Sequence, residues 1–334
     1  MAAETEGATT NGRPADAGRP ARGFSRKQAG APSSKPVGHA RERNDRRLGY
    51  LMVAPAIILL LIVTAYPLIT NIWNSLHNDN QTFATNPRNF SGLHNYDKVL
   101  TSSLWQSALE RTLVFTVVSI VFDIVVGMGL ALMMHRKFRG RGLVRASVLI
   151  PWAMPTVVSA MLWTTMFNQR NGFVDYFLGA FHAPWSSLVW IGQSVPRSWV
   201  AIFVADSWKN IPFVAIILLA GLQVIPNEVY EAAKMDGATW WQAFRRVTLP
   251  MVKPALSVAV IFRTLQALLV FDVVYIMTGG GPGTSTQVLS YLNFREFITD
   301  TDFGIGGAMS IMLIVIALIV SFIYVRVFRP TRGA

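Results

Sequence analysis

The sequence has no cysteine and few charged residues, which make up 14% of its 334 positions. Without cysteine the chain cannot form disulfides, use a thiolate nucleophile, or bind zinc or iron–sulfur clusters through sulfur ligands. Soluble domains usually carry about a quarter charged residues, whereas 52% of the residues here are hydrophobic. This composition excludes a water-soluble fold and indicates a membrane protein.

Motifs for nucleotide, metal and nucleophilic chemistry are also missing. No Gly-x-x-x-x-Gly-Lys-Ser/Thr sequence occurs, so the chain has no Walker loop to hold ATP phosphates. The glycine-rich stretch 279–283 lacks the lysine of such a loop. The five histidines are scattered without metal-ligand spacing, and no Ser/His/Asp arrangement stands out. We therefore expect no catalytic site, metal site or cofactor in this chain.

Long apolar runs are the dominant feature of the sequence. A bilayer core about 30 Å thick requires roughly 20 mostly apolar residues in a helix, because the backbone must satisfy its own hydrogen bonds there. The sequence therefore predicts an all-α, polytopic membrane protein with six transmembrane helices. The six runs cover residues 49–70, 108–134, 147–167, 199–225, 255–277 and 306–328.

The basic residues lie mainly on one side of this predicted bundle. Of the 30 Lys and Arg residues, 22 lie before the first run, at the C-terminal end from Arg326 onward, or in the segments around 135–146 and 226–254. The three segments on the opposite side, 71–107, 168–198 and 278–305, together hold only five Lys and Arg residues. Because cytoplasmic segments are enriched in Lys and Arg, this asymmetry places both termini in the cytoplasm.

Two regions with different composition divide the chain. Residues 1–48 are rich in Ala, Gly, Pro, Ser and Arg and have almost no large apolar side chains. Such a segment cannot bury enough surface to order itself, so we expect a disordered, basic cytoplasmic tail. Residues 49–330 are expected to form one transmembrane domain with a cytoplasmic loop at 226–254.

The first half of that loop predicts a short helix with an exposed face. Asn227 is suited to cap its start, and Gly237 can supply the left-handed residue that ends it. Ala232 and Ala233 leave little side-chain bulk beside the carboxylate of Glu231. This surface is suited to close approach by another protein.

A second short helix is expected to follow. Thr239 and Gln242 have the spacing of a capping box, and Pro250 and Pro254 are expected to end the helix and return the chain to the membrane. From spacing alone, an amphipathic hairpin that only packs against its own bundle is an equally good interpretation.

Two stretches resemble a known family. Glu231-Ala232-Ala233, Gly237 and Leu249-Pro250 resemble the EAA signature of permease subunits of binding-protein-dependent ABC importers. Val247 stands where the family usually has isoleucine, which keeps the β-branched, apolar character. The stretch 278–291 resembles the external loop of carbohydrate-uptake permeases such as those of the maltose and glycerol-3-phosphate importers.

This resemblance implies a transport subunit of the bacterial inner (cytoplasmic) membrane rather than an enzyme. Its partners would be a second homologous permease, a cytosolic ATPase dimer that binds ATP and Mg²⁺, and an extracytoplasmic solute-binding protein. The cargo would be a carbohydrate, with a disaccharide such as trehalose or maltose favoured. The implied ATPase-coupling residues are Glu231, Ala232, Ala233, Gly237, Leu249 and Pro250.

Polar residues within the apolar runs are candidates for the substrate pathway, because a charge inside a membrane usually faces a wet cavity or a partner. The fourth run is the most polar, and Pro212 is expected to unwind it. Salt bridges that hold the bundle together explain the charged residues equally well. The predicted pathway residues are Asp206, Lys209, Asn210, Phe213, Arg263 and Asp272.

Two other classes of protein remain open. An ion-coupled secondary transporter would use Asp123, Asp206 and Asp272 as ion sites, although no repeat symmetry is visible. A membrane enzyme such as a lipid-linked sugar transferase would need a metal or carboxylate motif and a soluble domain, and neither is evident.

Overall fold

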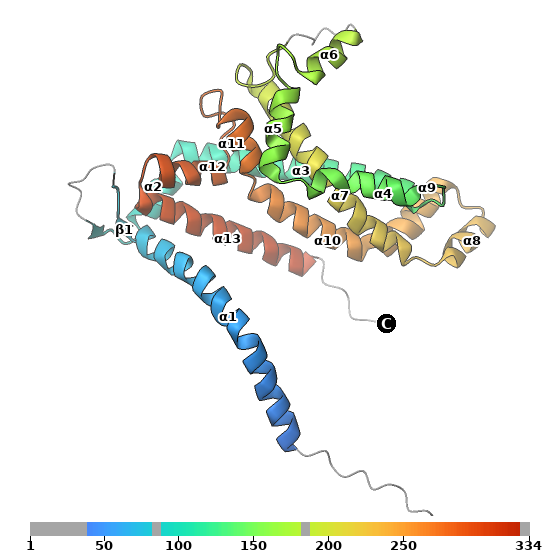
Figure 1. Ribbon diagram of the computed structural model, residues 1–334, viewed down its shortest axis with the longest axis horizontal. Helices are drawn as coiled ribbons and strands as arrows, with labels where there is room; N and C mark the ends of the chain where they lie inside the picture. Colours follow the sequence, from blue (N-terminus) through green and yellow to red (C-terminus); the bar gives the residue numbers. More distant parts are fainter. Residues whose placement is uncertain (1–38, 82–87, 182–187, 328–334) are drawn as a thin grey trace, which may run out of the picture. The chain divides into compact units, whose positions relative to one another are not determined.

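The computed structural model describes residues 39–81, 88–181 and 188–327 (Figure 1). The chain divides between Leu60 and Leu61 into two units. Within the described residues, the first unit is the beginning of helix α1, and the second contains the rest of α1 and every other element. Most of the segment predicted to be a disordered tail, residues 1–38, lies outside the described residues.

The described part of the chain is mostly helical with almost no strand, as the sequence predicts. Two short strands of two residues each, β1 and β2, pair with each other in antiparallel orientation. The elements are α1 (His39–Ser75), β1 (His77–Asn78), β2 (Asn89–Phe90), α2 (His94–Thr101), α3 (Ser103–His135), α4 (Arg141–Ala153), α5 (Thr156–Met166), α6 (Phe173–Ala180), α7 (Val195–Gln223), α8 (Asn227–Met235), α9 (Trp240–Ala243), the π-helical turn η1 (Phe244–Thr248), α10 (Leu249–Leu268), α11 (Asp272–Thr278), α12 (Leu289–Phe294), the π-helical turn η2 (Arg295–Thr299) and α13 (Phe303–Val327).

Five of the six predicted apolar spans are confirmed as continuous helices, and the remaining run is a bent pair of helices. Five helices in the described part of the chain are long and apolar enough to cross a membrane. The sixth predicted run corresponds to the pair α4 and α5, which is apolar and long enough only when the two helices are taken together and which is bent by 94° (Figure 1). The bend falls at Met154 and Pro155, because proline disfavours helical backbone in the residue before it. The five continuous spans are Gly49–Ser75, Ser103–His135, Val195–Gln223, Trp240–Leu268 and Phe303–Tyr324.

Several predicted boundaries are wrong. Helix α1 begins at His39, so it covers the last ten residues of the segment 1–48. Helix α7 continues through Pro212 rather than unwinding there. The fifth span extends from Trp240 to Leu268, so Pro250 and Pro254 lie in its interior and do not end a helix. Pro250 directly follows the π-helical turn η1 and the first residue of α10, and prolines are tolerated in membrane helices because local π adjustments and neighbouring helices satisfy the freed backbone groups.

Small residues set how closely the central helices approach one another. A Cβ atom on Gly127 of α3 would lie 2.7 Å from a methyl group of Val214 on α7. A Cβ atom on Gly221 of α7 would lie 2.5 Å from the Cβ of Ala255 on α10. Close helix contacts of this kind drive association inside membranes, where apolar burial gains nothing relative to lipid. Helices α3, α7 and α10 therefore form the tightly packed centre of the second unit.

At one end of the second unit, polar contacts connect the hairpin to α2 and α13. The Asn95 amide donates hydrogen bonds to the carbonyl oxygens of Ser75 and His77, at 2.9 and 2.8 Å. Gly304 at the start of α13 lies so close to this strand that a Cβ atom would come within 2.6 Å of the His77 oxygen. Gly304 therefore permits close packing between α13 and β1.

Candidate functional site

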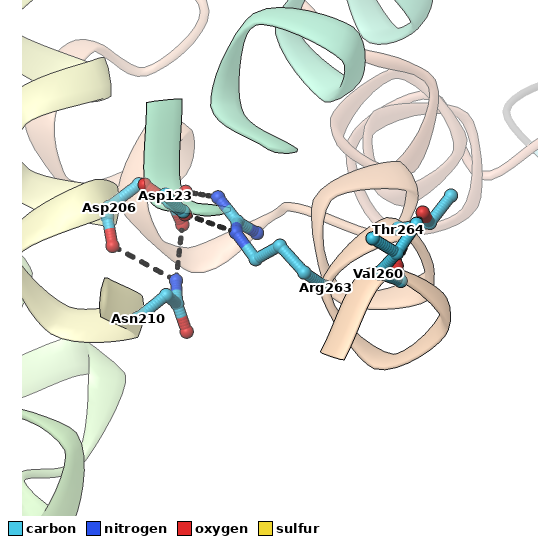
Figure 2. Close-up of polar contacts among 6 residues, drawn as sticks. All are labelled: Asp123, Asp206, Asn210, Val260, Arg263 and Thr264. Carbon is cyan, nitrogen blue, oxygen red and sulfur yellow. Dashed lines mark hydrogen bonds and ion pairs between the residues drawn. The ribbon is translucent and has the colours of Figure 1, made fainter. Parts of the chain in front are cut away.

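A buried cluster of three charges lies at the centre of the helix bundle. Arg263 of α10 is 0% exposed, and its guanidinium is ion-paired with Asp123 of α3 and Asp206 of α7 (Figure 2). A charge in this environment requires a partner, because desolvation costs several kcal/mol per ion. The two ion pairs therefore connect the three central helices. For Arg263 and Asp206, the structure supports the salt-bridge interpretation of the intramembrane charges.

The cluster carries two carboxylates and one guanidinium, a formal net charge of −1. Asp206 is the carboxylate of the cluster that also lines the adjoining cavity. Its side chain is 8% exposed, whereas that of Asp123 is 0% exposed. The Asn210 amide, one helical turn later, donates to the Asp206 carbonyl at 2.9 Å and to the Asp206 carboxylate at 3.1 Å. Asn210 therefore fixes the side chain that faces both the cluster and the adjoining cavity.

This cavity has a volume of about 410 Å³ and lies against α7, the end of α10 and the bend between α4 and α5. Four of the six predicted pathway residues line it, and Arg263 and Phe213 do not. Its remaining wall is apolar apart from Thr156 and Gln266. The lining residues that bear on ligand chemistry are Trp152, Asp206, Lys209, Asn210, Gln266 and Asp272.

Lys209 also makes a contact that its position in the sequence does not predict. Its ammonium group donates a hydrogen bond to the carbonyl oxygen of Trp152, at 3.3 Å. The last carbonyl groups of α4 lack helical partners because the helix stops at the bend, and a cation is favourable at this negative end of a helix. Lys209 therefore lines the cavity and also holds the bend of the broken span.

Phe213 and Asp272 differ from their predicted positions. The Phe213 ring stacks on Trp152 with ring centroids 5.2 Å apart, so Phe213 supports an aromatic wall that Trp152 forms. Asp272 was predicted to lie inside the fifth span, but α10 ends at Leu268 and Asp272 is the first residue of the separate helix α11. A carboxylate is favourable at that helix start.

The EAA-like segment forms a second candidate site, and its local structure largely follows the sequence. Gly237 has φ +74°, and the Ala238 N–H returns to the Ala233 carbonyl at 2.9 Å, which ends α8. Thr239 and Gln242 form the expected capping box at the start of α9. The predicted cap at Asn227 is wrong, because Pro226 occupies the cap position and no side chain caps α8.

One face of α8 packs inward and another is free. The Tyr230 hydroxyl lies 3.1 Å from the Thr248 hydroxyl, and its ring packs against the apolar cluster formed by α3, α7 and α10. Glu231 and Ala232 are exposed, and Ala233 is half-buried. The segment therefore presents an anionic, side-chain-poor surface while remaining fixed to the bundle.

Comparison with known proteins identifies the family. Residues 123–332 match the family described as the binding-protein-dependent transport system inner membrane component. The chain belongs to this family. The matched segment contains all three residues of the charge cluster, the cavity and the EAA-like segment.

The permease is also similar to characterised relatives over most of its length. It is 41% identical to the trehalose/maltose transport system permease protein MalF of Thermococcus litoralis, an alignment that covers 86% of this chain and 96% of the relative. It is 38% identical to the trehalose transport system permease protein SugA of Mycobacterium tuberculosis, over 85% of this chain and 89% of the relative.

A solved structure shares the fold. A bacterial alginate ABC transporter, in complex with an alginate pentasaccharide-bound periplasmic protein, matches with a TM-score of 0.74 at 24% identity. The match covers 86% of this chain and 96% of the other. The chain is therefore a multi-pass membrane protein with the fold of an ABC importer permease.

Of the six lining residues that bear on ligand chemistry, Trp152 and Gln266 were not predicted from the sequence. Trp152 lies beside Pro151 and three residues before Pro155, so the proline pair marked this region as irregular. Gln266 lies on α10 three residues after Arg263, which places the two within one turn. Neither the prolines near Trp152 nor the spacing between Arg263 and Gln266 indicates that the Trp152 or Gln266 side chain faces a cavity.

Proposed function

We propose that this permease is one of two membrane-spanning subunits of an ATP-driven importer of a disaccharide such as trehalose or maltose. The names of the two relatives at 41% and 38% identity support the choice of sugar. The subunit would form half of the translocation pathway, with both termini in the cytoplasm as the distribution of Lys and Arg indicates.

The single observation that carries the proposal is the chemistry of the cavity. Sugar hydroxyls both donate and accept hydrogen bonds, and the wall offers carboxylates, an ammonium group and the amides of Asn210 and Gln266. Trp152 adds an aromatic face against which the apolar side of a pyranose ring can pack. The volume of about 410 Å³ lies in the range of small-molecule sites. The second permease would complete the pathway.

Coupling to ATP is proposed to occur through residues 226–254. Glu231 would pair with a basic group of a cytosolic ATPase, and Ala232 and Ala233 would allow close helix packing. Gly237 would hold the turn, and Leu249 and Pro250 would connect the loop to α10. ATP and Mg²⁺ would be bound by the ATPase subunits, and a solute-binding protein would deliver the sugar from the other side.

The ion-coupled alternative finds less support. It requires carboxylates that can bind and release an ion, whereas Asp123 and Asp206 are both paired with Arg263. Asp272 begins a short helix, where its charge is already stabilised.

The test is to express the tagged chain with its neighbouring genes, purify the complex and measure ATP hydrolysis with the solute-binding protein. Trehalose, maltose and glycerol-3-phosphate would be compared. Hydrolysis that rises with one disaccharide supports the proposal. A chain that purifies alone and transports in ATP-free proteoliposomes along an ion gradient would refute it.

The cavity is tested by Asn210→Ala and Gln266→Ala. Loss of one hydrogen bond to a sugar hydroxyl should raise the apparent KM about three- to tenfold. Gln106→Ala is the matched control, because Gln106 is exposed at the far end of α3 and only donates to the Leu100 carbonyl. Equal KM values for all three variants would remove the cavity from the sugar pathway.

A further inference from the structure

A dense group of cations lies in the connection between α3 and α4. We call it the basic patch, and it comprises Arg136, Lys137, Arg139, Arg141 and Arg145. The first four side chains are exposed and Arg145 is half-buried. The sequence has no Asp or Glu between residues 124 and 174. In the described parts of the chain, none of the five cations lies within 4.0 Å of a carboxylate.

The basic patch is held at the end of a membrane span. Helix α3 has 33 residues, or about 50 Å of helix. This exceeds the roughly 30 Å hydrocarbon core, so a terminal turn extends into the headgroup layer. The Arg145 guanidinium donates to the carbonyl oxygen of Met134 at 2.8 Å, which ties α4 to the last turn of α3. Arg136 directly follows His135, the last residue of α3, so the cations lie at one end of this span.

Apolar side chains are interleaved with these cations. Phe138 is 42% exposed and Leu143 is 75% exposed. A surface that mixes exposed apolar groups with Lys and Arg is typical of segments that lie in the membrane interface, with the apolar groups toward the acyl chains and the cations toward the phosphates. A surface that binds only soluble anions has no use for the exposed Phe138 and Leu143.

The patch also contains a hollow of suitable size and charge. A depression of about 420 Å³ is lined by Lys137, Phe138, Arg139 and Arg141. Gly140, with φ +84°, turns the chain between them, and no side chain caps the first turn of α4. Three cations around one hollow repel one another unless an anion joins them.

We propose that the basic patch binds the headgroup of an anionic phospholipid, with the phosphate among Lys137, Arg139 and Arg141 and the acyl chains beside Phe138. This inference depends on α3 spanning the membrane and not on the identity of the transported sugar. Lipid binding and sugar transport can therefore fail independently in experiments.

The experiment measures lipid binding to the purified full chain, with any co-purified partners, by native mass spectrometry during titration with phosphatidylglycerol or phosphatidylcholine. The variant Arg139→Gln/Arg141→Gln should lower the apparent affinity for phosphatidylglycerol by about fivefold per cation removed and leave that for phosphatidylcholine unchanged. Arg139→Lys/Arg141→Lys keeps the charges and should bind nearly as well as the original chain.

The matched control is Lys98→Gln/Arg170→Gln, which removes two exposed cations from the segments on the opposite side of the predicted bundle. It should not change the affinity for phosphatidylglycerol. The proposal is overturned if both double Gln variants bind phosphatidylglycerol equally well, or if inorganic phosphate displaces the lipid at equal concentration. It is also overturned if the patch variant loses a co-purifying ATPase while keeping its lipid affinity, because the patch would then be a protein-docking surface.

Discussion

Arg263 of α10 is ion-paired with Asp206 of α7, and the same Asp206 carboxylate accepts a hydrogen bond from Asn210 in the cavity wall. The charge cluster and the proposed sugar site are therefore adjacent and share one residue. A substitution in the cluster should affect both the stability of the bundle and the geometry of the cavity, and the two effects can be separated by the choice of variant.

Removing the guanidinium should destabilise the protein strongly. Arg263→Ala leaves two unpaired carboxylates in the bundle centre, a change that costs about 3–5 kcal/mol for buried pairs. We expect a lower melting temperature of the detergent-purified chain and less protein in the membrane. The triple variant Asp123→Asn/Asp206→Asn/Arg263→Met, which removes all three charges, should recover part of the stability. A fully stable Arg263→Ala variant would contradict the structural role of the ion pairs.

Lys209→Met tests the bend between α4 and α5. The substitution keeps the length of the side chain but removes the donor to the Trp152 carbonyl. We expect the apparent KM for sugar uptake to rise about two- to fivefold, equivalent to ~0.3–1 kcal/mol for a cation at a helix end. Lys209→Arg should retain most of the affinity, and Lys98→Met, at an exposed lysine, should change nothing. A normal KM for Lys209→Met would show that the bend holds its position without this contact.

Gly237→Pro tests the coupling segment. With φ +74°, Gly237 occupies a backbone conformation that proline cannot adopt. Transport and sugar-stimulated ATP hydrolysis should be lost while the protein still inserts into the membrane at its usual level. Gly237→Asn is the matched control, because asparagine tolerates left-handed backbone, and it should keep partial transport. Normal uptake by the proline variant would mean that this turn has no part in coupling.

Glu296 gives a pH dependence that can be measured. Burial, with smaller contributions from Asp300 and Asp302, raises the pKa of this carboxyl above its ordinary value of 4.5. The folded state then binds the proton more tightly than the unfolded state, so stability should fall as the pH rises through the interval between the two pKa values.

Glu296→Gln should flatten this part of the curve of melting temperature against pH, measured on the purified chain from pH 4 to pH 8. Glu110→Gln, at an exposed glutamate of α3, is the control. An identical slope for the original chain and the Glu296→Gln variant would exclude Glu296 as its source.

Signals that are local in sequence predicted the structure well. The apolar runs specified the spans because a helix in lipid must be apolar along its length. The capping box of Thr239 and Gln242 and the left-handed Gly237 followed from side chains acting within a few residues. Pro226 took the place of Asn227 as the cap, which is a shift of one residue.

Features that depend on distant contacts were not predictable. Asp123 and Arg263 are 140 residues apart, and no local pattern identifies them as partners. Positions 269–271, where the helix breaks after Leu268, hold neither glycine nor proline, so no local signal separates Asp272 from the fifth span. The cavity wall combines residues from three parts of the chain, and only their packing brings Trp152 beside Gln266.

The unbroken helix Trp240–Leu268 has a mechanical consequence. Its 29 residues include the π-helical turn η1 and extend about 43 Å at the α-helical rise per residue, from the coupling segment to the cavity. A tilt of about 5° around the Trp240 end would displace the Leu268 end by about 4 Å, more than the length of a hydrogen bond. A small rotation of α9 would therefore move the Leu268 end of the helix far enough to make or break contacts with a sugar.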